Sequence, residues 1–161
     1  MDTQELFCLL KKEAEYFSVN DIIKRVVADS QSPGSLEQLS LLSKYDLEAL
    51  MEIKSRDCLE TIEDVEIEKL KDFVFRIDRY MEENAPDQPD LARYVRMVSI
   101  YLAFIAKKPL HPPGMVLSDG RSIASKHGNY YCPLKKKQLH ERLSLCQYCV
   151  SKESGLMDES E

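Results

Sequence analysis

The chain has 161 residues and a formal net charge of −6, and 43% of its residues are hydrophobic and 31% charged. A chain of this length buries roughly 70% of the surface that it exposes when unfolded, so this composition excludes overall disorder and predicts one compact domain. The longest apolar stretch, residues 98–106, is far shorter than the roughly 20 residues of a membrane span, so no membrane contact is expected.

The first part of the chain carries apolar residues at the three- and four-residue spacing of amphipathic helices. In the first predicted helix these residues are Phe7, Leu10, Ala14 and Phe17. A second helix is expected to begin after Asn20 and to end at the turn formers Pro33 and Gly34. The sequence therefore begins with two helices that each have one apolar face.

Three pairs of residues then have the spacing of a helix capping box. The pairs are Ser35 with Gln38, Ser43 with Asp46, and Thr61 with Asp64. We interpret the first as the start of a short segment and the second as the start of a further helix. The third is predicted to open a long amphipathic helix that continues to Met81.

The most apolar helix is predicted to follow Pro89, which suits the first helical position because it has no amide hydrogen to leave unsatisfied. From Leu91 to Ile105 this helix is apolar nearly all round, and Pro109 ends it. We expect it to be the buried centre of the fold. Residues 1–108 are therefore predicted to form a helical bundle, called here the helical body.

The sequence changes character after Pro109, where turn-forming Pro and Gly residues become frequent. Short strands are expected at residues 116–117, 122–124 and 129–132, with one small hairpin, followed by a last helix at residues 135–145. We predict that residues 109–152 form a small, partly β, Cys/His-rich unit packed on the helical body, called here the C-terminal module. The acidic tail, residues 153–161, is expected to fray.

Three cysteines in the C-terminal module suggest a metal site. Cys146 and Cys149 form a C-x-x-C pair, a spacing that presents two sulfurs to one tetrahedral ion, and Cys132 precedes Pro133 after a predicted strand. Three thiolates and one imidazole would complete a Cys3His zinc site. An iron–sulfur cluster could use the same sulfurs, and buried free thiols are the simpler alternative.

The fourth ligand is expected to be His111, because the neighbouring prolines fix its backbone. His127 in a predicted turn and His140 on a predicted helix are the alternatives. Two further cysteines, Cys8 and Cys58, have the spacing of helical apolar faces, so we expect them to lie in the core.

The compartment and the basic residues agree with a metal site. Residues 1–5 are acidic where an export signal would be basic and then apolar, so we expect a cytoplasmic protein with reduced thiols rather than disulfides. Lys135, Lys136 and Lys137 lie between the predicted ligands in the sequence. Nearby cations lower the pKa of a thiol and favour the metal-binding thiolate.

The C-terminal third resembles a family of archaeal proteins of unknown function that is seen chiefly in methanogens. The resemblance covers roughly residues 110–152 and rests on a His-Pro-Pro-Gly-Met run from His111, a Tyr-Tyr-Cys-Pro run from Tyr130 and the C-x-x-C pair. After Met115 the chain has Val-Leu-Ser-Asp where the family has a more aromatic and glycine-rich run. The resemblance implies a similar fold and an archaeal cytoplasm, and it brings no activity with it.

These features favour a binding or assembly module over an enzyme. The sequence lacks a Walker loop, a dinucleotide-binding glycine pattern and a G-x-S-x-G motif, and three cysteines are typical of closed, structural metal sites. A metal-dependent or redox enzyme is one alternative. The other is nucleic-acid binding, because residues 104–152 carry nine Lys and Arg and three interleaved tyrosines, namely Tyr130, Tyr131 and Tyr148. The acidic chain as a whole opposes binding to a polyanion, so a protein partner is expected instead.

Overall fold

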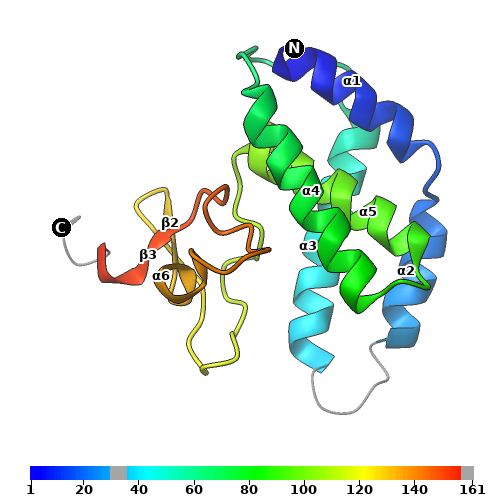
Figure 1. Cartoon of the computed structure of the whole chain (residues 1–161). Helices are drawn as coiled ribbons and strands as arrows, with labels where there is room; N and C mark the ends of the chain where they lie inside the picture. The colour runs from blue at the N-terminus through cyan, green and yellow to red at the C-terminus, as the bar shows by residue number, and fades with distance from the viewer. Residues whose placement is uncertain (30–35, 157–161) are drawn as a thin grey trace.

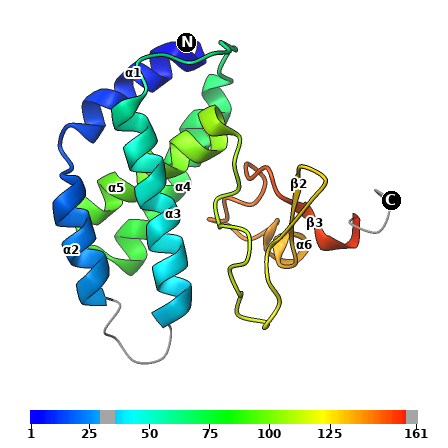
Figure 2. The same cartoon turned by 180° about the vertical axis from the view of Figure 1, so that it is seen from behind.

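The computed structural model describes residues 1–29 and 36–156. The helical body consists of α1 (Thr3–Ala14), α2 (Val19–Asp29), α3 (Leu36–Ser55), α4 (Ile67–Asn84) and α5 (Pro89–Ile100), and α5 continues as the π-helix η1 (Tyr101–Ala106). Figures 1 and 2 show these helices packed together, with the C-terminal module beside them. The mainly α-helical fold predicted from the sequence is confirmed. No helix within the described residues is long and apolar enough to cross a membrane.

The interior of the helical body is formed by apolar side chains from all of its helices, with Ile22 contributed by α2. The largest fully buried side chains among them are Phe7, Leu50, Ile53, Phe73, Met97 and Tyr101. All four residues predicted for the inner face of the first helix are buried. Asp2 begins α1 with a reciprocal capping box, in which the Glu5 amide donates to the Asp2 carboxylate and the Asp2 amide donates to Glu5.

Two predicted helix starts are wrong. Helix α3 is continuous through Ser43, which lies in its interior, and α4 begins at Ile67 rather than at Thr61. The residues before α4 pair with the N-terminus instead, because the Thr3 amide donates to the carbonyl of Glu63 (2.9 Å) and Val65 donates to the carbonyl of Met1 (3.0 Å). Tertiary pairing of this backbone thus outweighs the local capping pattern. The predicted turn at Pro33 and Gly34 and the predicted start at Ser35 lie outside the described residues.

Helix α5 begins as predicted, with Pro89 in its first turn. Burial starts later than expected, because Leu91 is still 36% exposed, whereas Met97 and Val98 are almost fully buried. The helix ends at Lys107, whose φ of 53° is in the left-handed region, and the Lys107 amide donates to the carbonyl of Leu102. This left-handed residue closes the π-helix and turns the chain toward the C-terminal module.

The C-terminal module contains a small sheet made of β1 (Ala124–Lys126), β2 (Asn129–Cys132) and β3 (Lys152–Glu153). Strands β1 and β2 form the predicted hairpin, with His127 and Gly128 at its turn in left-handed conformations. Strand β3 is parallel to β2 and pairs Glu153 with Cys132, so Glu153 does not begin a frayed tail. The 3-10 helix η2 (Ser154–Leu156) follows, and residues 157–161 lie outside the described residues.

The predicted last helix is wrong in its length. The helix α6 (Lys135–Gln138) ends seven residues before residue 145, and turns follow it. The carbonyls of Arg142 and Ser144 accept hydrogen bonds from Arg76 of α4, at 3.1 Å each, instead of joining a helix. Contact with the helical body therefore decides the conformation of this segment.

Candidate metal centre

A cleft of about 990 Å³ separates the C-terminal module from helices α3, α4 and α5. The four residues predicted to bind metal, His111, Cys132, Cys146 and Cys149, all line this cleft. They come from three separate segments: the loop after η1, the end of β2, and the turns that follow α6. The fold thus brings side chains that are far apart in the sequence to one side of the module.

Two of the three sulfurs are held by backbone amides. The Cys132 thiol is partly buried, and burial raises its pKa, while the amides of Leu134 and Lys135 donate to the sulfur and lower it. Cys146 and Cys149 are near enough to raise this pKa further. The Cys149 sulfur accepts a hydrogen bond from the Leu110 amide at 3.4 Å. Amides directed at sulfur stabilise its ionised form, which is the form that binds metal.

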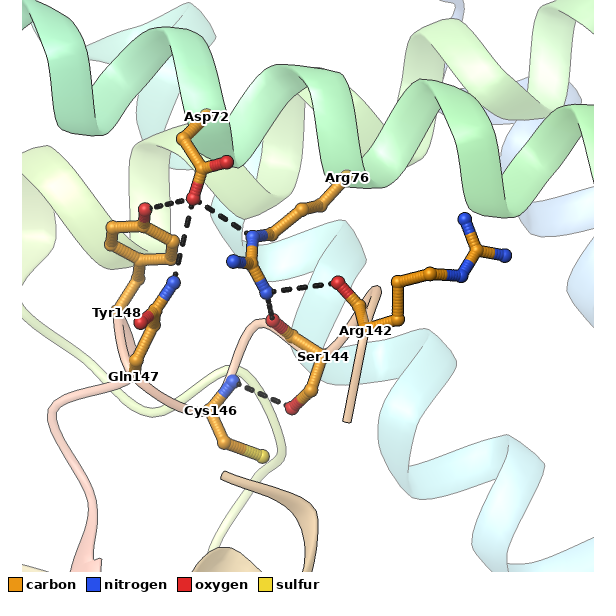
Figure 3. A network of polar contacts seen from close by, with 7 residues as sticks. All are labelled: Asp72, Arg76, Arg142, Ser144, Cys146, Gln147 and Tyr148. Carbon is orange, nitrogen blue, oxygen red and sulfur yellow. Dashed lines mark hydrogen bonds and ion pairs between the residues drawn. The ribbon is translucent and has the colours of Figure 1, made fainter. Parts of the chain in front are cut away.

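The C-x-x-C segment is fixed to α4 by a network of polar contacts (Figure 3). The Arg76 guanidinium donates to the Asp72 carboxylate of its own helix at 2.8 Å. It also donates to the carbonyls of Arg142 and Ser144, which precede the C-x-x-C pair. The Tyr148 hydroxyl donates to the same Asp72 carboxylate and, with Arg76, holds the pKa of Asp72 below its ordinary value. Cys146 donates its amide to the Ser144 hydroxyl at 3.1 Å, and its side chain points away from α4 in Figure 3.

Aromatic packing supports the same attachment. The Tyr148 ring meets Phe73 of α4 edge to face, with 5.5 Å between the ring centres, and lies 6.3 Å from Phe104 of η1. Sequence reasoning missed this role and considered Tyr148 only for base stacking in the nucleic-acid alternative. The missed signal is that a large aromatic side chain stands between the two cysteines of the pair. Tyr148 therefore anchors the module to the helical body.

The described side chains do not form a coordination geometry. Within residues 1–29 and 36–156, no three His, Cys, Asp or Glu side chains are grouped closely enough to hold a metal ion. The structure brings the four predicted ligands to one cleft without bringing them to one point. The metal site and its zinc therefore stay a prediction.

The three histidines differ in their positions. Of the three, His111 lines the cleft. Its side chain is exposed by surface area, but the surrounding protein partly desolvates the imidazole ring, and this desolvation lowers the imidazole pKa. A low pKa keeps the imidazole neutral, as a metal ligand must be. His127 is exposed at the hairpin turn, and His140 is exposed in the turns after α6. The position of His111 favours it over the other two.

The three lysines also differ. The Lys135 ammonium donates to the carbonyls of Cys149 at 2.8 Å and Ser151 at 2.5 Å, so it ties the C-x-x-C segment to α6. Lys136 and Lys137 are exposed. The three consecutive lysines therefore do not form one basic surface, because Lys135 is hydrogen-bonded within the module.

Two further expectations are corrected. Cys8 and Cys58 are exposed and not in the core: Cys8 lies on the outer face of α1, where Gln4 donates to it, and Cys58 lies in the loop after α3. The five cysteines, all within the described residues, carry free thiols. Tyr131, assigned to base stacking in the nucleic-acid alternative, is only 1% exposed. Its ring is therefore not accessible to a base.

Comparison with known proteins supports the family suggested by the C-terminal motifs. Residues 2–154 match the family described as "Uncharacterized protein conserved in archaea (DUF2115)". The chain is 38% identical over 160 residues to a UPF0305 protein of Methanocaldococcus jannaschii, covering 94% of this chain and 96% of that protein. A UPF0305 protein of Methanococcus maripaludis strain C7 is 33% identical over 164 residues, covering 95% and 98%.

A UPF0305 protein of Methanothermobacter thermautotrophicus is 26% identical over 163 residues, covering 94% of this chain and 96% of that protein. No solved structure matches the chain. The family match includes both the helical body and the C-terminal module. The chain belongs to the archaeal DUF2115 family.

Proposed function

We propose that this chain is a zinc-binding protein in which Cys132, Cys146, Cys149 and His111 hold one structural ion. The observation that carries the proposal is that these four residues, from three separate segments, line a single cleft. Backbone amides directed at the sulfurs of Cys132 and Cys149 add to it. Zinc favours sulfur and nitrogen ligands of this kind.

The weak interior of the C-terminal module supports a structural ion. Among the described residues of the module, the buried apolar side chains are Pro109, Pro112, Ile123 and Tyr131, and the main hydrophobic core lies in the helical body. Structural zinc contributes about 10 to 16 kcal/mol in small modules, against about 3 kcal/mol for a disulfide that closes a loop of about 15 residues. Such an ion would stabilise the C-terminal module, which buries few apolar side chains of its own. Binding requires the four side chains to turn toward a shared point, because they do not meet in the described arrangement.

The module so fixed is proposed to act as a binding or assembly surface for another protein, in a reducing cytoplasm. A protein partner is favoured over nucleic acid because Lys135 is bonded within the module and Tyr131 and Tyr148 are packed. Binding of nucleic acid that weakens strongly with salt would contradict this preference.

Elemental analysis with an absorption spectrum tests the metal proposal. We expect one zinc per chain and no visible colour in protein produced without added metal. Visible absorption with bound iron would instead assign an iron–sulfur cluster to the same residues. Absence of any bound metal from freshly purified, reduced protein would overturn the proposal.

Variants locate the ion. Replacing Cys132, Cys146 or Cys149 by Ser is expected to remove the zinc, whereas Cys8→Ser and Cys58→Ser are matched controls that retain it, because both are exposed and outside the module. His111→Ala is expected to weaken zinc retention, with His127→Ala as its control. Equal zinc content in all variants would refute the assignment of these ligands.

A further inference from the structure

The cleft holds a carboxyl group that the metal proposal does not use. Asp46 of α3 lines the cleft, and no hydrogen bond or ion pair to its carboxyl is present among the described residues. Burial alone raises the pKa of Asp46 to about 7. The apolar side chains that line the cleft from the helical body include Leu42, Ile77, Met81, Val95 and Leu102. By surface area Asp46 is half-buried, and its ionised form has no cationic partner among the described residues.

A second polar group in the cleft also lacks a partner. Ser151 is 2% exposed, lines the same cleft, and its hydroxyl has no hydrogen bond within the described part of the chain. Buried polar side chains are rarely left unpaired, and the exceptions are frequent at sites that bind a further group. Mostly apolar clefts with a few unmatched polar groups are typical of small-molecule sites.

The charges around the cleft indicate which charge a ligand would carry. The three Arg and Lys side chains that line the cleft already have partners: Arg76 pairs with Asp72, Arg142 pairs with Glu83 at 2.8 Å, and Lys135 donates to two carbonyls. None of them balances Asp46. Glu141 also lines the cleft, but it is exposed to water. A cation is therefore what the cleft would attract.

We propose that this cleft binds a small amine with an apolar body. The protonated amino group pairs with Asp46, and the carbon chain lies against the apolar lining. An ammonium–carboxylate hydrogen bond shielded from water is stronger than one at the surface. The amine proposal uses other residues than the zinc proposal, since neither Asp46 nor Ser151 is among the proposed ligands, and all six residues line one cleft.

Three probes with the same carbon chain test the proposal on the full-length protein: hexylamine, hexanol and hexanoate. In titrations followed by protein NMR, we expect hexylamine to bind saturably, at least about tenfold more tightly than hexanol, and hexanoate not to bind. Asp46→Asn is expected to weaken hexylamine binding about tenfold, while Glu141→Gln, which removes a carboxylate of the same cleft, leaves it unchanged.

A second variant keeps the carboxyl in place. Leu42→Lys adds a cation one helical turn before Asp46 on the cleft side, so it is expected to compete with hexylamine and abolish its binding. Zinc content measured on the same samples separates the two proposals, because Asp46→Asn leaves the cysteines intact. Equal affinity for hexylamine and hexanol, or undiminished hexylamine binding by Asp46→Asn, would overturn the amine site.

Discussion

Neutralising Asp46 is expected to stabilise the protein, and more so at higher pH. The pKa of Asp46 is about 7 in the fold against an ordinary value of 3.8, because burial disfavours its charged form. Above about pH 4 an unfolded chain releases this proton while the fold retains it, so the free energy of unfolding falls until about pH 7. The difference of about three pH units corresponds to a total loss of about 4 kcal/mol.

Asp46→Asn removes this loss because its side chain is neutral at every pH. We expect the stability advantage of the variant over the wild type to grow by about 2 to 3 kcal/mol between about pH 5 and about pH 8. The tyrosines nearest to Asp46 in charge interaction, Tyr45 and Tyr94, have raised pKa values and stay neutral in this range.

Urea denaturation followed by circular dichroism at both pH values measures the difference. The exposed Asp57 supplies the control, since Asp57→Asn is expected to change stability by less than about 0.5 kcal/mol at either pH. An advantage that does not change with pH, or a variant less stable than the wild type at high pH, would refute the argument from burial.

Three further predictions concern the attachment of the module and the first helix. Cys149→Ser is expected to make residues 109–152 sensitive to limited proteolysis while the helical circular dichroism signal persists; loss of that signal would show that module and body unfold as one unit. Tyr148→Phe removes the hydroxyl bonded to Asp72 and is expected to cost about 1 kcal/mol in urea denaturation, with a smaller loss than Tyr148→Ala, which also removes the ring packed on Phe73. Asp2→Ala removes a capping box and is expected to cost about 1 kcal/mol; an unchanged midpoint would show that α1 does not depend on it.

Sequence patterns correctly predicted the elements that depend on residues close together in the chain. The inner face of α1, Pro89 at the start of α5 and the hairpin of β1 with β2 all follow from spacing and turn chemistry. Two of the predictions that failed concern segments for which a distant part of the chain competes. Thr61 begins no helix, since the segment before α4 pairs with the N-terminus, and residues after Gln138 leave the helix, since Arg76 takes their carbonyls.

The residues of the candidate site also differ in whether the sequence could indicate them. Residue type and spacing were enough to single out Cys132, Cys146 and Cys149, because sulfur chemistry restricts what such residues do. The position of Tyr148 between the two cysteines did not by itself show that it anchors the module on α4, and no pattern indicated Asp46 as an unpartnered carboxyl facing the same cleft. Both depend on which surfaces of the helical body meet the module.

Helix periodicity and thiol spacing are properties of neighbouring residues, so a helical protein with a cysteine-bearing C-terminal part could be predicted from the amino-acid order. That the three cysteines and His111 share a cleft with Asp46 and Ser151 follows from the folded arrangement and from no local pattern. Burial and desolvation arise from side chains far away along the chain, and these set which polar groups are left without a partner.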